Sequence, residues 1–462
     1  QQLTGNPNVH LRLQTRVASA EVQGNTVQSV TATDTSGAAA RYVAKYFLDA
    51  TDLGDLLPLA NVEHVLGAES RAQTGEPSAP DAPRPDWIQP ITIPVALERR
   101  PAGENWTIAK PVQYEQLKLL QKYTIVDGYI STMFVPGKDM WSYRRFIAAA
   151  NFDDPALPTD LSMINTFGND YQGGTIPTGD PASDLAVTEA ARQAALGYIY
   201  WLQTECPRDG DPTRLGFPEL KPRGDLFGTS DGTAAAPYIR ESRRIQALRT
   251  IVQQDIDAAY NAGPRGKPFP DACGIGLYGG MDIHGLAAVG MPQSYVTIKP
   301  FQIPLGALIP TRVVNVLAAC KNLGVTHITN GAYRLHPVEW NVGESAGALA
   351  ALCVQQGLTP STVWSTPSLL RRYQHTLLDA GVPLFWWTDV TFDNKDLFVP
   401  AHMLGVAGIL AGADDLNLRP NDVLTDQERQ DIQQAVETPL EWPSGQLLRG
   451  QAAQWLAQAL GL

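Results

Sequence analysis

The sequence has few cysteines and no cluster of metal-binding residues. Its four cysteines show no CxxC spacing, which argues against a zinc ribbon and against a redox-active pair. The seven histidines are scattered, with no HExxH motif and no Cys/His cluster. We therefore expect no metal site.

Long apolar runs and basic blocks are also missing. No apolar run reaches the roughly 18 residues that a membrane-spanning helix needs. Asp and Glu outnumber Lys and Arg by 47 to 35, which gives a net charge of −12. Because no block of positive charge is available to neutralise phosphates, we expect neither a nucleic acid nor an anionic membrane as a partner. No secretory signal opens the chain, and its first residues do not resemble a translation start, so we expect an upstream segment to be missing.

What the chain does contain is enough apolar sequence for a large core. Hydrophobic residues make up 44% of its 462 positions and charged residues 18%, and this length suits two or three domains. Short apolar runs at 9–13, 17–22, 27–33 and 42–49 alternate with turn residues, which predicts an antiparallel meander. Towards its end, the last run consists almost entirely of apolar residues, which suits a strand buried on both faces. Prolines between 70 and 115 predict an extended surface segment.

Apolar residues at helical spacing predict much of the remaining structure. A run at 313–319 fits a buried strand. Helices are predicted at 185–206, 242–260, 344–356, 367–380, 399–410, 425–436 and 446–460. The chain should therefore be strand-rich at its start and helical towards its end.

A GxGxxG pattern occurs at residues 274–279. This pattern binds a dinucleotide only where it joins a strand to a helix whose first turn meets the pyrophosphate. Here the next residues, 280–285, do not suit a helix, and Lys299 stands near the position where an acidic residue is expected. We interpret the pattern as a glycine-rich strand and turn.

A GxSxG pattern at residues 343–347 allows two interpretations. It is the nucleophile elbow of serine esterases, with 338–342 as the preceding strand and with Asp389 and His402 completing the triad after Ser345. No HGGG-type oxyanion segment lies upstream of it. Alternatively, it is the start of a helix whose small residues allow close approach and point backbone N–H groups at an anion or a carbonyl oxygen.

A longer constellation surrounds this pattern. A buried strand that ends near Cys320 precedes a polar loop and then the small-residue helix, an order typical of a cofactor cradle. Over about residues 9–358 the sequence resembles the FAD-dependent oxidoreductases of the two-dinucleotide-binding-domain type. The segments that carry the resemblance are Asp-Ala-Thr-Asp-Leu-Gly-Asp-Leu at 49–56, then 67–71, 237–244, 278–284, 315–320 and 343–351. Asp52 stands where that family usually has glycine.

The resemblance implies an α/β fold of the FAD/NAD(P)-binding-like flavoprotein type, incomplete at its N-terminus, with a β-rich substrate region and a helical C-terminal tail. It divides the chain into a meander and return strand at 1–60, a substrate or cap region at 61–300, a flavin-binding strand and helix at 301–358, and the tail at 359–462. The implied cofactor is FAD. The Gly-rich βαβ unit that cradles its ADP part is expected upstream of Val9, so a second polypeptide or a cleaved N-terminal segment should supply it.

The resemblance also implies which residues bind the cofactor. A helix starting near Glu344 would direct its positive end at the pyrimidine carbonyl of the flavin and stabilise negative charge there. The other members lie in the 49–56 segment, at the start of the buried strand and in the GxSxG pattern. The full set is Asp49, Ala50, Thr51, Gly54, Asp55, Asn315, Gly343, Glu344, Ser345, Ala346 and Gly347.

Catalytic and substrate-binding residues are predicted from the same resemblance. His336, His284 and Arg334 are the candidates for catalysis, because histidine is the natural base near neutral pH for the proton that leaves a C–OH or C–NH group. Each histidine has the alternative of a structural hydrogen-bonding role. Arg240 and Tyr278 are the candidates for binding a small-molecule substrate.

Three arginines that are close in the sequence, Arg240, Arg243 and Arg244, also allow two interpretations. They either bind an anionic substrate or pair with Asp and Glu side chains. Trp386 and Trp387 are interpreted as core or interface residues rather than as a stacking platform.

The tail resembles a single S-layer-homology unit. Residues 387–390, 398–412, 418–421 and 424–425 carry this second resemblance, and Asp426 occupies the position of that family's arginine. Such units anchor proteins to cell-wall polysaccharide and usually come as three, so the resemblance implies the cell surface or the exterior. The alternative is a helical cap that packs on the main body.

These observations together predict part of a FAD-dependent oxidoreductase that oxidises a small organic or carbohydrate-like substrate by hydride transfer to flavin. One alternative is a non-catalytic, surface-associated assembly or binding protein on a flavoprotein scaffold. A third is a serine esterase that acts through Ser345.

Overall fold

The computed structural model describes residues 5–412, 414–436 and 438–462. The first four residues, on which the expectation of a missing upstream segment is based, lie outside the described residues. The chain divides into two compact units. Unit 1 contains Gln1–Pro85, Glu241–Asp282 and Tyr295–Leu462, and unit 2 contains Asp86–Arg240 and Ile283–Ser294. Both strands and helices are present, as a mixed α/β fold requires. The finer division of the sequence into four regions stays a prediction.

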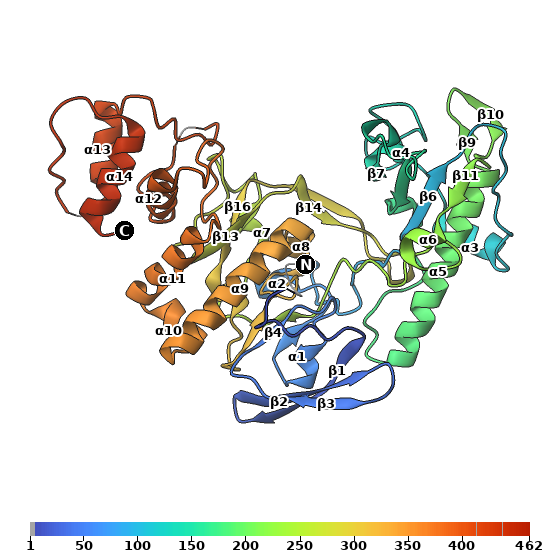
Figure 1. Cartoon of the computed structure of the whole chain (residues 1–462), viewed down its shortest axis with the longest axis horizontal. Coiled ribbons are helices and arrows are strands. Elements are labelled where there is room, and N and C mark those ends of the chain that lie inside the picture. The colour runs from blue at the N-terminus through green and yellow to red at the C-terminus, as the bar shows by residue number, and fades with distance from the viewer. Residues whose placement is uncertain (1–4, 413, 437) are drawn as a thin grey trace. The chain divides into compact units, whose positions relative to one another are not determined.

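Unit 1 begins with the predicted meander, drawn in dark blue in Figure 1. Strands β1 (Thr15–Gln23), β2 (Thr26–Asp34) and β3 (Ala39–Tyr42) pair antiparallel in that order. The strand predicted at 9–13 is wrong, because these residues lie in no strand and Leu13 is 74% exposed. An alternating pattern forms a stable strand only where a neighbouring strand accepts its hydrogen bonds.

A parallel strand pair follows the meander. Strand β4 (Phe47–Asp49) pairs with β17 (Val316–Ala318), so that Asp49 lies opposite Ala318. The run predicted as one strand at 42–49 is therefore divided between two sheets. Strand β17 is fully buried, which confirms the buried strand predicted at 313–319, although it is shorter.

The remaining elements of the middle of the chain are short. The helix predicted at 242–260 is wrong, because this segment holds β12 and a single turn, α7. Pairing of β12 with β5 and burial of Arg244 override the helical spacing of the segment. The elements are α1 (Leu56–Leu59), β5 (His64–Val65), α2 (Arg71–Thr74), β12 (Arg244–Ile245), α7 (Gln253–Ile256), β13 (Ala272–Gly276), β14 (Gly280–Ile283), β15 (Ser294–Thr297), β16 (Phe301–Pro304), the 3₁₀ turn Leu305–Leu308, α8 (His327–Tyr333) and α9 (His336–Gln356).

The GxGxxG pattern lies in β13 and the turn after it. Strand β13 pairs antiparallel with β16, and the residues after the turn form a further strand rather than a helix. This confirms the prediction of a glycine-rich strand and turn.

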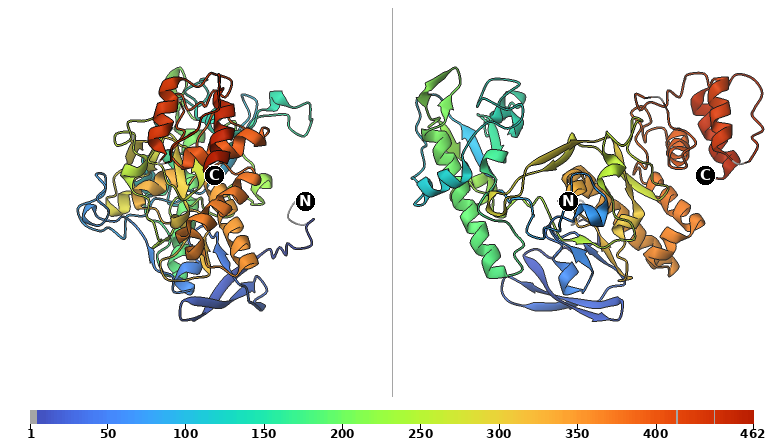
Figure 2. Two further views of the ribbon diagram at one scale, coloured as in Figure 1. Left: turned by 90° about the vertical axis from the view of Figure 1, so that its left-hand side faces the viewer. Right: turned by 180° about the vertical axis from the view of Figure 1, so that it is seen from behind.

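The tail is helical, as predicted, and its last helices are drawn in red in Figure 2. Its helices are α10 (Pro360–Ser365), α11 (Pro367–Asp379), α12 (Lys395–Val406), α13 (Asp426–Ala435) and α14 (Arg449–Leu460). The Tyr373 hydroxyl of α11 donates to the Ser345 carbonyl at 2.8 Å, and the Gln302 side chain donates to the Leu384 carbonyl at 2.8 Å. The tail therefore packs on the body of unit 1. Trp387 is 8% exposed, in agreement with its prediction as a core residue.

Unit 2 is a four-stranded sheet beside one long helix. The sheet has the order β11–β6–β8–β7, and helix α5 (Pro181–Thr204) confirms the helix predicted at 185–206. Asp180 starts α5, because its carboxylate accepts from the Ser183 backbone N–H at 2.9 Å. The elements are β6 (Val95–Arg99), α3 (Tyr114–Gln121), α4 (Met140–Tyr143), β7 (Arg145–Ile147), β8 (Leu161–Ile164), β9 (Pro207–Arg208), β10 (Asp211–Leu215), β11 (Leu220–Pro222), α6 (Gly224–Phe227) and the 3₁₀ turns Ala149–Asn151, Phe167–Asn169 and Ala287–Val289.

The extended surface segment predicted at 70–115 is wrong in its middle. Ile91, Ile93, Val95 and Leu97 are at most 1% exposed, and the residues between them are buried as well. Strand β6, which holds the last two of them, lies between β11 and β8. Pro94 and Pro101 lie on either side of β6 and no proline lies within it, so the sheet hydrogen bonds that proline would remove are kept. Within the described residues, no helix combines the length and the apolar character that crossing a membrane requires.

Candidate functional site

Helix α9 begins at His336, not near Glu344. Leu335, in an extended conformation, precedes its first turn, and Pro337 lies in that turn, where a missing N–H costs nothing. The prediction of a helix start near Glu344 is wrong, and so is the strand predicted at 338–342. The partial positive charge of the helix end therefore lies at its first turn near His336.

The GxSxG pattern lies inside α9. Ser345 is fully buried, and its hydroxyl donates to the Cys273 carbonyl at 2.5 Å. His402 lies in α12, where its Nδ1 accepts the backbone N–H of Phe385 at 3.0 Å and burial lowers its pKa to about 3. The carboxylate of Asp389 accepts the backbone N–H of Leu418 at 2.8 Å. This geometry gives no support to a serine nucleophile, because an elbow needs a sharp strand-to-helix turn.

Small residues nevertheless bring α9 close to the parallel strand pair. A Cβ added to Gly343 would lie 3.4 Å from the carbonyl oxygen of Ala319, which directly follows β17. Ala346 is fully buried one turn later, and Gly347 faces open space. The small residues thus allow close packing from the middle of the helix. They cannot direct free backbone N–H groups at a ligand, as predicted for a helix start, because they do not lie in the first turn.

The loops at the carboxyl ends of β4 and β17 hold unsatisfied acceptors. Asp49 accepts the backbone N–H and the hydroxyl of Thr51 at 3.0 and 2.7 Å through one oxygen, while its second oxygen is buried with no partner among the described residues. Burial raises the pKa of the Asp49 carboxyl. Asn322 donates to the Asp49 carbonyl at 2.9 Å, and its own side-chain oxygen is likewise buried without a described partner. Ligands of parallel sheets bind beyond these strand ends, so the two acceptors fit a bound group that carries N–H or O–H donors.

The other predicted cofactor residues stabilise these loops. The hydroxyl of Thr51 accepts the backbone N–H of Asp55 at 2.6 Å, and Gly54 between them has a φ of 63° that favours glycine. Ala50 joins Asp49 to this turn. Asn315 ties the start of β17 to the meander, because its side chain donates to the Val27 carbonyl at 2.8 Å and accepts the Val27 N–H at 2.9 Å.

Asp52, the departure from the family pattern, belongs to an ion-pair cluster. Its carboxylate lies 2.8 Å from the ammonium of Lys321, which is 3% exposed and lies 2.9 Å from Glu339 on its other side. Burial alone would lower the pKa of Lys321, but Glu339 and Asp52 hold it above its usual value. Burial also raises the pKa of the adjacent Cys320 thiol to about 12. The side chain at position 52 therefore neutralises a buried lysine.

Three more predicted residues lie in unit 1, and their roles stay predictions. Arg334 is buried, donates to the Asp282 carbonyl at 3.0 Å and lies 3.7 Å from the Asp282 carboxylate. His336 is the first residue of α9. Tyr278 packs against the core of the unit between β13 and β14.

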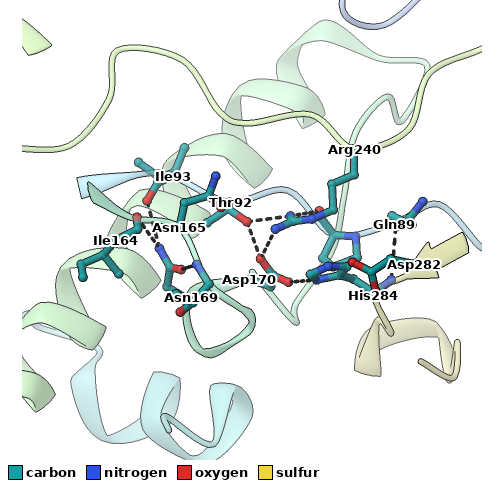
Figure 3. A network of polar contacts seen from close by, with 12 residues as sticks. Gln89, Thr92, Ile93, Ile164, Asn165, Asn169, Asp170, Arg240, Asp282 and His284 are labelled. Atoms are coloured by element: carbon teal, nitrogen blue, oxygen red, sulfur yellow. Dashed lines mark hydrogen bonds and ion pairs between the residues drawn. The ribbon is translucent and has the colours of Figure 1, made fainter. Parts of the chain in front are cut away.

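Unit 2 contains a buried cluster of polar side chains, shown in Figure 3. One oxygen of Asp170 lies 2.5 Å from Nδ1 of His284. The other oxygen lies 2.8 Å from the Arg240 guanidinium and accepts the hydroxyl of Thr92. Arg240 also donates to Thr92 at 2.7 Å and to the Pro90 carbonyl at 2.9 Å. The carboxylate is thus held from both sides by charged or polar donors.

Burial and charge set the protonation state of this cluster. Asp170 is fully buried and Arg240 is 3% exposed, whereas the side chain of His284 retains 14% exposure. Burial alone would raise the pKa of Asp170, but Arg240 and His284 hold it below its usual value. The carboxylate is therefore ionised at neutral pH and stabilises a protonated imidazole.

Asp170 is the functional candidate that the sequence did not reveal. It follows a 3₁₀ turn fixed by Asn169, whose side chain accepts the Thr166 backbone N–H at 2.8 Å. Gln121 donates to the Asp170 carbonyl at 2.7 Å. Asp170 and His284 are 114 positions apart, and no spacing pattern joins them. The feature of the sequence that could have pointed to Asp170 is an acidic residue directly after Gly168 and Asn169, which favour a turn.

All three arginines lie close to carboxylates, as the second interpretation expects, and binding of a substrate by Arg240 stays a prediction. Arg240 pairs with Asp170, and Arg243 lies 3.5 Å from Asp55. Arg244 lies 2.5 Å from Glu241 and 3.0 Å from Glu69. In the described part of the chain, no group of three or more His, Cys, Asp or Glu side chains is arranged to hold a metal ion.

We expect the free energy of unfolding of unit 2 to fall at low pH, because Asp170 becomes protonated. Because the folded pKa of Asp170 lies below that of an unfolded carboxyl, about 3.9, its contribution is complete above about pH 4 and is lost as the pH falls further. Asp170→Asn should therefore reduce the difference in unfolding free energy between about pH 6 and about pH 3, measured by urea denaturation. Asp225→Asn, at an exposed partner of Arg223, is the control, and an equal change in both variants would contradict the prediction.

Comparison with known proteins identified one matching family model. This model, described as FAD dependent oxidoreductase, matches residues 1–377. A search of curated proteins found no match, and neither did a search of solved structures.

Proposed function

Because the chain belongs to the FAD-dependent oxidoreductase family, whose cofactor is FAD, we propose that it oxidises a small organic or carbohydrate-like substrate by hydride transfer to the flavin. His284 acts as the base in this proposal. A substrate with an alcohol or amine group next to a transferable hydrogen suits such a base.

The contact of 2.5 Å between Asp170 and Nδ1 of His284 carries the proposal. A buried carboxylate at Nδ1 fixes the orientation of the imidazole and stabilises its protonated form, so proton exchange with a substrate takes place at Nε2. Arg240 and Thr92 both bind the other oxygen of Asp170. Their contacts favour a role in positioning Asp170, in place of the substrate-binding role first predicted for Arg240.

The chain's residues have defined tasks in this reaction. When bound, FAD supplies the acceptor for the two electrons of the substrate C–H bond. Nε2 of His284 would take the proton from the hydroxyl oxygen, and the hydride would pass from the carbon that bears this hydroxyl to the bound flavin, so that the C–O bond becomes a carbonyl. Asp170 stabilises the positive charge that the imidazole gains. The proton is released from His284 to solvent after the product has left.

We further propose that the loops after β4 and β17 hold the cofactor in unit 1. The buried acceptor oxygens of Asp49 and Asn322 provide partners for its N–H and O–H groups, and Thr51, Gly54 and Asp55 shape the loop beside them. The first turn of α9, rather than Glu344, offers the partial positive charge of a helix end.

A Gly-rich βαβ segment from a second polypeptide or a cleaved N-terminal segment is proposed to complete this site. Among the described residues, β4 pairs only with β17, and Leu48 in β4 is 37% exposed. A sheet of only two strands leaves its edges unpaired and is marginally stable, so this pair favours additional strands.

The test begins with the natural assembly, purified without tags. Its visible absorption spectrum and the intact masses of all its chains are recorded, and candidate alcohols, sugars and amines are then added without oxygen. We expect the spectrum of oxidised flavin and its loss with at least one substrate. A colourless assembly would contradict the proposal. It would favour the surface-associated assembly or binding protein, for which the S-layer-like tail and a location at the cell surface or exterior are the proposed features.

A further inference from the structure

A cavity of about 270 Å³ lies in unit 1 where the tail meets the body. Its wall is formed by the loop at 263–268, by Phe301 and Gln302 of β16 and by tail residues that include Phe385 and Leu410. Most of these side chains are apolar. Arg265 is the charged residue among the described lining residues, and none of the lining residues belongs to the sites discussed above.

The Arg265 guanidinium is held in a fixed position. Its Nε and one terminal nitrogen donate to the Trp386 carbonyl at 2.9 and 2.6 Å, and the other terminal nitrogen donates to the Ala411 carbonyl at 2.7 Å. The group lies 4.3 Å from the ring centroid of Phe385 and 4.9 Å from that of Trp387. An arginine has five N–H donors, so these three bonds leave two N–H groups for a ligand.

No carboxylate of the described residues neutralises this guanidinium. Within the described parts of the chain, its polar contacts are with carbonyl oxygens, and no Asp or Glu lies within ion-pair distance. Arg265 is partly buried, whereas the buried Arg240 and Arg244 each pair with a carboxylate. Burial lowers the pKa of Arg265 to about 10, so it still carries its charge at neutral pH. A cation in apolar surroundings is costly without a counter-charge, and an anionic ligand would provide one.

We propose that this cavity binds a small apolar monocarboxylate, whose carboxylate pairs with Arg265 and whose hydrocarbon part lies against Phe301, Phe385 and Leu410. The planar fork of arginine matches a carboxylate, and aromatic and aliphatic walls match a chain or ring of carbon atoms. The volume lies just below the usual range for ligand pockets, about 300–1,000 Å³, which favours a small ligand. The proposal does not depend on the proposed oxidation, because the cavity and the polar cluster of unit 2 share no residues.

The test uses octanoate and its neutral isostere octanamide with the full chain, and calorimetric titration measures binding. Loss of a charge-assisted hydrogen-bonded pair typically changes affinity by about tenfold or more, so octanoate should bind at least about tenfold more tightly than octanamide. Arg265→Gln should remove this preference, and Arg265→Lys should restore part of it. Arg429→Gln is the matched control, since Arg429 also lies over a tryptophan ring, 5.3 Å from Trp442, and donates to a carbonyl in the tail.

A photoreactive apolar carboxylate locates the site on the unaltered chain, which keeps the test decisive should Arg265→Gln fail to fold. We expect labelled peptides from 263–268 or 385–411. Labelling elsewhere, equal binding of octanoate and octanamide, or no saturable binding of octanoate would overturn the proposal. Equal losses of octanoate binding in Arg265→Gln and Arg429→Gln would also overturn it, because the effect would then not be specific to the cavity.

Discussion

Replacing His284 with glutamine is expected to lower turnover by about 10²- to 10⁴-fold, which is the usual contribution of a positioned general base. Glutamine is close in size to histidine but cannot accept a proton at neutral pH. Asp170 would keep its contacts with Arg240 and Thr92, so unit 2 should stay folded. The measurement is the rate of flavin reduction without oxygen, in a single turnover with the substrate that the proposed screen identifies.

The control for this variant is His64→Gln. The Nδ1 of His64 contacts the carbonyl of Val62 at 2.8 Å instead of a carboxylate, and His64 is partly buried in β5. Its replacement should leave the reduction rate within about twofold, since its Nδ1 contacts a backbone carbonyl and His64 has no part in the proposed reaction. Both variants should contain as much flavin as the unaltered protein. An unchanged rate in His284→Gln would move the base to another residue, of which His336 is the first to test.

The pH profile separates a base from a merely structural histidine. A base must be neutral to accept the substrate proton, so a base at this position predicts a reduction rate that rises with pH. Asp170→Asn removes the carboxylate that orients the imidazole and should lower the rate while the rise with pH is kept. A structural role for His284 would lower the rate equally at every pH. The two variants therefore test the role of the pair independently of its effect on folding.

Local patterns predicted the tail well and the middle of the chain poorly. Helices α11, α13 and α14 agree with their predicted positions, because each has an apolar and a polar side, whereas the largely buried α12 begins and ends four residues earlier than predicted. Around Arg244 the same spacing did not form a helix, because an ion-pair cluster and a strand partner determine the local structure there. Intrinsic preference is outweighed where long-range contacts are strong.

The candidate site was predictable only where a resemblance pointed to it. His284 and Arg240 were named from family segments, yet their common partner Asp170 was not, because the contact joins residues far apart in sequence. The GxSxG pattern shows the opposite case. The short pattern fits two different functions. Only the structure shows that α9 begins at His336, so that residues 343–347 lie in the middle of the helix rather than at its start.

Arg244→Met is expected to produce the largest loss of stability, about 3–5 kcal/mol in the free energy of unfolding of unit 1. The guanidinium is fully buried and binds Glu241 at 2.5 Å, Glu69 at 3.0 Å and the carbonyls of Gly67 and Val325 at 2.6 and 3.0 Å. Burial alone would lower the pKa of Arg244, but the two carboxylates hold it above its usual value. Methionine matches much of the volume but leaves both carboxylates without their cation.

Denaturant unfolding of the variant is compared with that of Arg312→Met. Arg312 pairs with Glu63 at 2.5 Å, but both side chains are more than a third exposed, at 35% and 38%. Loss of this exposed ion pair should therefore cost less than about 1 kcal/mol. The decisive step is Glu69→Gln in the Arg244→Met background. If uncompensated buried charge causes the loss, neutralising one carboxylate should recover part of it, whereas a loss of packing alone would not be recovered. Glu69 suits this purpose because its other oxygen accepts the His327 backbone N–H at 2.9 Å, a bond that the glutamine oxygen can also accept. Recovery would thus identify charge balance, rather than shape, as the reason that Arg244 occupies a fully buried position in unit 1.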